Sequence, residues 1–436
     1  MDLKTEGRES TMSEKQKTEN EKSPVKVLWI AQSCSLQDDK ENPGLTGRME
    51  PVMNRYPAGR IRLAVAYMAD GIHEKKFTKD GIDYFAVGGN MRVGSSEADW
   101  ETARRDLVRV CEDFQPDIIQ CFGAEWPYGQ IAESVDIPVV IHMMGFLNIY
   151  YLSIQMARGT VSDKKGMAAR LKEGIKRLLH LAQEKETEVE RQAAVERRVM
   201  NVNRYFLGRT EWDRNIVKYY SPGSLYFHVP EMIKPSVYEA AGQWKYHAGE
   251  RIRLFSLSSG DDRKGNEILL RTADILKNVL HLDFEWRVAG SKDFFPTFEK
   301  RTGISHEDVG IRLLGMIGSA EIIEEMKSAD LFIHPSIMDN SPHAVCEAQL
   351  IGLPVIASNV GGVPDLVEKG KTGFLYPYNE PHTLAFLIAN VYPDEEKLTA
   401  ISKTAVKTAR ERHDPERIAL TLFQTYQSII KDYHGK

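Results

Sequence analysis

Residues 330–359 read DLFIHPSIMDNSPHAVCEAQLIGLPVIASN, in which two apolar runs enclose a polar turn and a short helical stretch. The runs at 330–334 and 353–357 have the length and composition of strands that are buried on both faces. Between them, Ser341 is a suitable helix N-cap and Pro342 a suitable first helical residue. The order strand, helix, strand predicts a parallel βαβ unit with the polar turn at the carboxyl end of its first strand.

Similar units extend along both halves of the chain. Strands that are apolar on both faces and alternate with helices are typical of a parallel sheet covered on both sides. The expected strands lie at 25–31, 60–68, 81–89, 116–123, 137–145, within 205–220, and at 251–259, 282–290, 311–318, 330–336 and 353–359. The expected helices lie at 96–114, 127–134, 164–203, within 205–220, and at 265–280, 319–329 and 415–431. The pattern predicts an α/β protein with two Rossmann-like, doubly wound parallel sheets.

The length of the chain favours two domains. With 436 residues it is too long for a single hydrophobic core. Residues 1–23 are rich in Glu, Lys, Ser and Thr and predict a disordered tail. The two expected sheets assign residues 24–235 to an N-terminal domain and residues 236–412 to a C-terminal domain. The amphipathic helix within 413–436 is expected to pack back on the body of the protein.

Composition excludes several classes of protein. A net charge of -5 gives no global attraction to nucleic acid, so we expect no nucleic-acid partner. The four cysteines form no C-x-x-C motif, which fits a reduced cytoplasmic protein better than a disulfide framework or a zinc site. The N-terminus lacks the pattern of a signal peptide. The most membrane-like stretch, 137–152, is short and interrupted, so we expect a core strand that runs into a loop.

Two carboxylates lie close to the helix start in the opening segment. Asp339 lies in the turn before the helix and Glu347 lies inside the helix, with seven residues between them. Asp339 could assist capping while Glu347 is an ordinary surface residue, since carboxylates at this spacing are common. Alternatively, both could face a ligand beside the free N–H groups near His343, because a helix start at a strand end attracts anions.

Three neighbouring motifs bear on this choice. The segment GDDRKGNEIL places Arg263 and Lys264 between a strand and a helix, where they could bind a diphosphate or form a solvated loop. The segment GMIG, which begins with Gly315 and Met316, is a strand-end turn that lets the backbone approach a flat ring. The segment NVGG at 359–362 leads into another short helix. Each motif alone also fits an ordinary turn.

Together and in this order, the motifs resemble a known family. Residues 336–375 closely resemble the donor-site segment of glycosyltransferase family 4, which contains retaining enzymes with the GT-B fold. The resemblance covers most of residues 251–377, and the first half matches less sharply through PDIIQCFG, IPVVIHMMG and GRTEWDR. It implies two Rossmann-like domains that face a central cleft. It also implies transfer of a sugar from a nucleoside diphosphate sugar, with a UDP-sugar the first expectation and a GDP-sugar the alternative, to a glycan or lipid-linked glycan acceptor in polysaccharide biosynthesis.

The resemblance implies roles for individual residues. Glu347 would accept hydrogen bonds from the ribose hydroxyls, and Asp339 would contact hydroxyls of the donor sugar. Lys264, with Arg263 beside it, would bind the diphosphate and stabilise it as a leaving group. The segment from Asn340 to His343, which also contains Ser341 and Pro342, would offer backbone N–H groups to the sugar and phosphate. The chain contains no D-x-D motif, so we expect cationic side chains rather than a metal ion, and no cofactor, at this site.

Three positions depart from the family pattern. Asp339 replaces a glutamate, which shortens the reach of the carboxylate. Ser258 and Ser259 occupy the strand end where relatives carry an arginine. Met144 occupies the position of a histidine that meets the donor sugar or the acceptor in many relatives. His142 lies two residues earlier on the same strand face, where it either substitutes for that histidine or belongs to the core.

The acceptor side is less defined. Gly47 and Arg48 match a glycine-containing loop near the phosphates and acceptor, although a mobile loop without ligand contact is an equal alternative. Residues 158–177 contain seven Lys or Arg and a few apolar residues. They could form a peripheral contact with the inner face of a membrane, or a solvated helix whose apolar face packs in the core.

Three functions remain open from the sequence. The leading hypothesis is a metal-independent retaining hexosyltransferase. A GT-B-like sugar-nucleotide epimerase would use the same donor without an acceptor. The departures at the donor site also allow a catalytically silent relative that acts as a binding or scaffold subunit. A two-lobed periplasmic sugar receptor is disfavoured by the absence of a signal-peptide pattern.

Overall fold

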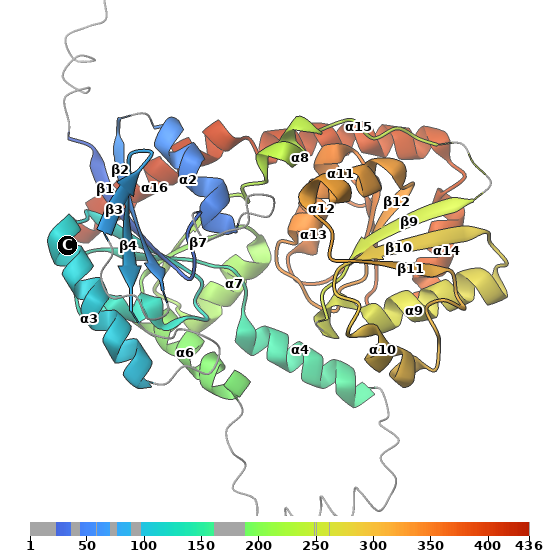
Figure 1. Cartoon of the computed structure of the whole chain (residues 1–436), viewed down its shortest axis with the longest axis horizontal. Coiled ribbons are helices and arrows are strands. Elements are labelled where there is room, and N and C mark those ends of the chain that lie inside the picture. Colours follow the sequence, from blue (N-terminus) through green and yellow to red (C-terminus); the bar gives the residue numbers. More distant parts are fainter. Residues whose placement is uncertain are drawn as a thin grey trace, which may run out of the picture.

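The computed structural model shows two α/β domains, each built on its own sheet (Figure 1). It describes residues 23–35, 44–57, 59–69, 76–88, 97–160, 188–247, 249, 251–260 and 262–435. The expected tail at 1–23, apart from Ser23, lies outside the described residues, and so do residues 161–177 of the basic stretch. Both expectations therefore stay predictions.

The N-terminal domain is built on an eight-stranded sheet with the order β3-β4-β2-β1-β5-β6-β7-β8. Neighbouring strands pair in parallel except for the antiparallel edge strand β3. Its strands are β1 (Val25–Ala31), β2 (Ile61–Met68), β3 (Lys76–Lys79), β4 (Ile82–Val87), β5 (Ile118–Phe122), β6 (Val139–His142), β7 (Tyr205–Gly208) and β8 (Leu225–His228). Its helices are α2 (Leu45–Arg55), α3 (Glu97–Phe114), the 3-10 helix η1 (Pro127–Glu133), α4 (Leu147–Thr160), α6 (Glu188–Val202) and α7 (Glu211–Tyr220).

The C-terminal domain is built on a six-stranded parallel sheet with the order β11-β10-β9-β12-β13-β14. Its strands are β9 (Ile252–Leu257), β10 (Phe284–Ala289), β11 (Ile311–Gly315), β12 (Leu331–His334), β13 (Val355–Ser358) and β14 (Phe374–Tyr376). Its helices are α8 (Pro235–Glu239), η2 (Asp262–Lys264), α9 (Asn266–Asp274), the π-helical turn η3 (Ile275–Val279), α10 (Phe295–Thr302), α11 (Ser319–Ser328), α12 (His343–Ile351), α13 (Val363–Leu366), α14 (Pro381–Val391) and α15 (Glu395–Arg412). The prediction of two doubly wound sheets is confirmed.

The strand order places a topological switch point in the C-terminal sheet. Strand β9 lies between β10 and β12. The chain therefore adds β10 and β11 on one side of β9 and then adds β12, β13 and β14 on its other side. Doubly wound sheets bind ligands beyond the carboxyl ends of their strands at such a point. The turn after β9 carries Lys264 and the turn after β12 carries Asp339. Topology therefore brings together two residues that are 75 positions apart in the sequence.

The last helix, α16 (Pro415–His434), crosses back from the C-terminal domain to the N-terminal domain (Figure 1). Its apolar side joins the buried cluster on one face of the N-terminal sheet. Tyr426 ties it there, because its hydroxyl accepts a hydrogen bond from Trp29 Nε1 at 3.0 Å and donates one to Gln120 Oε1 at 2.5 Å. The chain thus connects the two domains twice.

Two stretches differ from the sequence prediction. Helix α2 lies inside the segment that we expected to be a loop, and its buried residues Thr46, Met49 and Met53 have helical spacing. Helix α4 follows β6 where we expected a loop. The amides of Leu147 and Asn148 at the start of α4 donate to the Glu196 carboxylate at 2.8 and 3.0 Å. Because this N-terminal cap comes from a distant helix, the local sequence does not reveal it.

Among the described residues, no helix is both long enough and apolar enough to cross a membrane.

Candidate functional site

A cleft of about 800 Å³ opens between the two domains at the carboxyl ends of β9 and β12. The N-terminal domain contributes Arg48, Met144 and Arg209 to its lining, and the C-terminal domain contributes residues from the segments after β9, β10, β11 and β12. This volume is in the range of pockets that hold small molecules and cofactors. The cleft is therefore the candidate ligand site.

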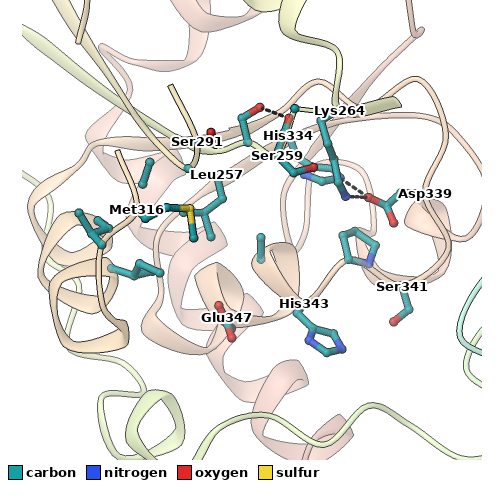
Figure 2. A pocket seen from close by; sticks show the side chains of 18 of the residues that line it. Leu257, Ser259, Lys264, Ser291, Met316, His334, Asp339, Ser341, His343 and Glu347 are labelled. Atoms are coloured by element: carbon teal, nitrogen blue, oxygen red, sulfur yellow. Dashed lines mark hydrogen bonds and ion pairs between the residues drawn. The ribbon is translucent and has the colours of Figure 1, made fainter. Parts of the chain in front are cut away.

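An ion pair lies in the cleft lining where the segments after β9 and β12 meet. Lys264 Nζ is 2.6 Å from Asp339 Oδ2, and His334 Nε2 is 3.2 Å from the same oxygen (Figure 2). Burial alone would raise the pKa of Asp339, but Lys264 and His334 outweigh it and hold that pKa below its usual range. Burial lowers the pKa of His334, so the imidazole is neutral near pH 7.

Glycine residues allow the two turns to meet. Gly265 has φ +71, and a Cβ at this position would lie 1.8 Å from the carbonyl oxygen of Pro335. Gly361 has φ +52, and a Cβ there would lie 1.9 Å from the carbonyl oxygen of Asp339. The KG and GG pairs in the sequence are thus explained by close backbone approach around Asp339.

Helix α12 presents polar groups to the cleft that the protein itself does not pair. Glu347 lines the cleft and is 5% exposed, and no hydrogen bond or ion pair joins it to any residue in the described part of the chain. Ser341, just before the helix, also lines the cleft, and its buried Oγ has no hydrogen-bond partner there either. The first amides of an α-helix lack intrahelical acceptors as well. A buried carboxylate, a hydroxyl and free amides in one cleft indicate a polar ligand.

A chain of charged groups joins the domains behind α12. Arg209 Nη1 donates to the buried carboxylate of Glu231, and Arg209 Nη2 donates to the Met144 carbonyl oxygen at 2.8 Å. His343 Nε2 is 2.5 Å from Glu231 Oε1, and Arg48 Nη1 is 2.5 Å from His343 Nδ1. Burial would raise the pKa of Glu231, but Arg209 and His343 outweigh it and keep the carboxylate ionised.

Three further contacts cross between the domains. The Asn340 side chain accepts from Thr210 Oγ1 at 2.6 Å and donates to Asp213 Oδ2 at 3.1 Å, and both partners belong to the start of α7. The guanidinium of Arg263 lies 4.2 Å from the ring centroid of Tyr150 on α4. These residues hold the walls of the cleft in place.

The comparison with protein families agrees with this geometry. Residues 243–408, which include every C-terminal residue discussed above, match the family Glycosyl transferases group 1. Residues 243–408 thus belong to this family.

Individual relatives in the family have modest identity and partial overlap. The amylovoran biosynthesis glycosyltransferase AmsK of Erwinia amylovora is 27% identical over 173 residues, which are 37% of this chain and 42% of AmsK. A D-inositol 3-phosphate glycosyltransferase of Corynebacterium glutamicum is 35% identical over 100 residues, 23% of this chain and 24% of that protein. The chain thus spans less than half the length of these relatives.

Solved structures show that the GT-B fold covers both domains. Sucrose-phosphate synthase from Thermosynechococcus elongatus superposes with a TM-score of 0.70 over 94% of this chain and all of that protein, at 14% identity. HepE of Anabaena, in complex with UDP and glucose, superposes with a TM-score of 0.62 over 93% of this chain and all of HepE, at 17% identity. At these identities, the likeness shows the fold alone.

The structure separates the predicted site residues into two sets. Seven of them line the cleft: Lys264, Met316, Asp339, Ser341, Pro342, His343 and Glu347. Five do not: Gly47, His142, Arg263, Gly315 and Asn340. Among the described residues, no group of three or more His, Cys, Asp or Glu side chains is arranged to hold a metal ion.

Two details of the predicted site need correction. The N-cap of α12 is Pro342, not Ser341, and the helix begins at His343. His142 is 2% exposed and its Nδ1 lies 3.3 Å from Gln120 Nε2, so it belongs to the core rather than to the cleft lining. Burial lowers its pKa to about 4, so it is neutral at pH 7. Met144, two residues later, does line the cleft.

Sequence analysis missed three residues that shape the cleft. Arg209 and Lys234 line it, and Glu231 lies directly behind it. Glu231 and Lys234 belong to the proline-flanked segment PEMIKP, where two charged residues lie among apolar ones. The signal in the sequence was the presence of two charged residues in this otherwise apolar linker. Buried charges require partners, so such residues are candidates for a polar site.

Proposed function

We propose that the protein is a retaining glycosyltransferase that transfers a sugar from a nucleoside diphosphate donor, with UDP as the leading candidate, to a glycan or lipid-linked glycan. The observation that carries the proposal is the unpaired, buried Glu347 carboxylate in the cleft of a group 1 glycosyltransferase domain. Because no described residue pairs with it, this carboxylate is available to accept hydrogen bonds from a ligand in the cleft. The two hydroxyls of a ribose supply such donors.

The remaining groups of the cleft suit the other parts of the donor. The turn with Met316, which is 81% exposed at the end of β11, is an open platform suited to a flat base. The free amides at the start of α12 and the Ser341 hydroxyl suit phosphate oxygens. Lys264 also lines the cleft, and its positive charge would stabilise the diphosphate as it leaves. Asp339, paired to Lys264, is an acceptor for hydroxyls of the donor sugar.

The proposed reaction breaks the bond between C1 of the sugar and the β-phosphate oxygen, whose electron pair remains on the phosphate. C1 then bonds to the acceptor hydroxyl oxygen on the face that the phosphate leaves, and the hydroxyl proton passes to the departing phosphate. The protein needs to position the groups and stabilise the negative charge that develops on the diphosphate. The same-face course rests on the resemblance to retaining enzymes.

The identity of the donor base is supported by HepE, whose structures contain UDP with glucose and UDP-glucose. Acceptor classes are suggested by the relatives, among them AmsK, a biosynthetic enzyme for amylovoran. A peripheral contact with the inner face of a membrane through residues 158–177 would suit a lipid-linked acceptor.

Thermal unfolding with UDP, GDP and ADP in separate samples tests the donor site first. A nucleotide at about one hundred times its dissociation constant stabilises the folded protein by roughly 2.7 kcal/mol. We expect the midpoint to rise with one nucleotide, and we expect UDP to be that one. The matching sugar nucleotides are then incubated with the protein, and products are separated by chromatography.

The products distinguish the three functions. Slow release of free sugar, accelerated transfer when a glycan acceptor is added, and no new sugar nucleotide support the transferase. An epimeric sugar nucleotide would indicate the epimerase instead. Nucleotide binding without any turnover would indicate a silent relative, and no binding by the folded protein would refute the donor site.

A further inference from the structure

His334 is a buried histidine in the cleft lining. It is the last residue of β12 and is 2% exposed. Its Nε2 lies 3.2 Å from Asp339 Oδ2, yet it has no hydrogen-bond partner in the described part of the chain (Figure 2). Buried polar atoms are nearly always hydrogen-bonded, so an exception beside a ligand cleft points to a function in that cleft.

One carboxylate oxygen of Asp339 lies beside two groups that can carry a positive charge. Lys264 Nζ is 2.6 Å and His334 Nε2 is 3.2 Å from Oδ2. The other oxygen, Oδ1, accepts from the backbone amide of Asn340 at 3.1 Å, which brings no full charge. The Asp339 side chain is only 13% exposed, and a buried carboxylate that loses its cation is costly. Asp339 therefore needs a substitute when Lys264 turns to another anion.

We propose that His334 takes up a proton when the donor binds and then replaces Lys264 as the positive partner of Asp339. This inference rests on the proposed function, in which Lys264 contacts the diphosphate. The proton comes from water and binds the ring nitrogen that is unprotonated in the neutral imidazole. His334 is thus a positioning residue, which keeps the Asp339 carboxylate ionised and in place to accept hydrogen bonds from hydroxyls of the donor sugar.

The charges around His334 favour a neutral ring before binding and a charged ring afterwards. Burial lowers the pKa of His334, Asp339 raises it, and Lys264 lowers it again. A diphosphate that contacts Lys264 offsets the positive charge of the lysine, so the negative charge of Asp339 then acts on the imidazole with less opposition. Histidine has an ordinary pKa of roughly 6.5 and aspartate one of roughly 3.9, so the proton is expected on His334 rather than on Asp339.

The elements packed against β12 do not change this assignment. Strand β13 pairs Ala357 with His334, and strand β9 presents Ser256, whose hydroxyl donates to a β12 carbonyl oxygen at 2.8 Å. Neither residue titrates. Burial and the charge of Asp339 raise the pKa of Tyr150 on α4, so its phenol stays neutral at pH 7, and Arg263 over its ring is always protonated. Lys264 and Asp339 are therefore the charges that set the protonation of His334.

The proposal gives donor affinity a pH dependence of definite sign. Because binding raises the pKa of His334, affinity should increase as the pH falls from the pKa of the bound state towards the lower pKa of the free state. It should level off below the pKa of the free state. Within this window, uptake of one proton changes the dissociation constant by up to about tenfold for each pH unit.

Calorimetric titration of the full chain counts the proton. UDP, GDP and ADP are titrated first, and the one that wild type binds is then used between about pH 5 and 8 in buffers of different ionisation enthalpy. Wild type should take up as much as about one proton more per nucleotide than His334→Gln, whose side chain cannot become charged. The terminal phosphate of the nucleotide itself titrates near pH 6, but its contribution cancels in this comparison.

His306→Gln is the matched control. The His306 side chain also lies beside a carboxylate, with Nδ1 2.7 Å from Glu299 Oε1, but it is not part of the cleft lining. This variant should bind the nucleotide and take up protons like wild type.

Two further variants test the proposal even if His334→Gln does not fold. Asp339→Asn leaves no negative charge to stabilise a charged ring, so the additional proton uptake should vanish. Lys264→Met leaves Asp339 without its lysine before any nucleotide binds, so the pKa of His334 should already be raised in the free protein. In spectra of protein with ¹³C-labelled histidine, one of the twelve histidine signals should titrate at a higher pH in free Lys264→Met, and in nucleotide-bound wild type, than in free wild type.

The outcomes separate this proposal from the proposed function. Equal proton uptake by wild type and His334→Gln, or uptake that persists in Asp339→Asn, would overturn the role of His334 while nucleotide binding left the donor site intact. The absence of a shifted histidine signal in both Lys264→Met and nucleotide-bound wild type would overturn it as well. If wild type binds no nucleotide, or Lys264→Ala binds it normally, the proposed donor site itself is wrong.

Discussion

The substitution Glu347→Ala tests whether this residue contributes to nucleotide binding or to the stability of the fold. In the cleft, its carboxylate is 5% exposed, and the described residues provide it with neither a hydrogen bond nor an ion pair. Glu347→Ala therefore removes no internal contact, and the free energy of unfolding of the free protein should stay within about 0.5 kcal/mol or rise. A hydrogen bond to a charged group contributes about 1.5–3 kcal/mol, so the dissociation constant for the nucleotide should increase roughly 10- to 150-fold.

The measurement pairs urea unfolding of the free protein with calorimetric titration of the nucleotide that wild type binds. Gln349→Ala is the matched control on the same helix. The Gln349 side chain donates to the carbonyl oxygens of Leu366 and Thr372 at 2.9 and 3.3 Å and accepts from Arg412 at 3.1 Å. Its loss should destabilise the protein by about 1–3 kcal/mol while leaving nucleotide affinity near that of wild type. If Glu347→Ala instead destabilised the protein and bound nucleotide normally, the ribose role would be refuted.

Three other perturbations follow from the geometry. Gly265→Ala forces a Cβ against the Pro335 carbonyl oxygen, so it should lower stability by about 2 kcal/mol or more and weaken nucleotide binding, as measured by thermal unfolding with and without nucleotide. Glu231→Ala leaves Arg209 buried without its carboxylate, so urea unfolding should show a loss of about 3–5 kcal/mol, whereas a loss under 1 kcal/mol would contradict the pairing. Burial raises the pKa of Glu125 to about 7, so the folded state favours the neutral acid and stability should fall, by up to about 3 kcal/mol, as pH rises from about 4.5 to 7. Glu125→Gln should flatten that part of the pH profile, and an unchanged slope would show that the group titrates normally.

Much of the fold followed from local pattern. Strands β12 and β13 are buried at every residue, which matches their apolar composition and short length. Helix α3 covers Glu97–Phe114 of the expected range 96–114, and its apolar residues keep helical spacing throughout. The strand order then places the topological switch point beside β9. Because β9 and β12 are neighbours, Lys264 after β9 and Asp339 after β12 lie close together.

The contacts between the domains could not be predicted in the same way. Arg209, Glu231 and His343 come from three separate segments, and their pairing depends on how two complete domains approach one another. No local period or cap signals such a contact. Asn340 illustrates the difference, since the sequence motif suggested only a backbone N–H for a ligand and gave no sign that its side chain bonds to Thr210 and Asp213 of the other domain.

Hydrogen-bond partners divide the motif DNSPHAVCE into residues whose side chains bond within the protein and residues whose polar groups face the cleft without a protein partner. Asn340 and His343 contact the N-terminal domain, while Ser341 and Glu347 offer unpaired groups to the cleft. Asp339 lies between the two classes, because Lys264 already satisfies it in the free protein. Under the proposed function, a donor diphosphate that binds Lys264 would share it with Asp339, so this ion pair would compete with the diphosphate for the cation.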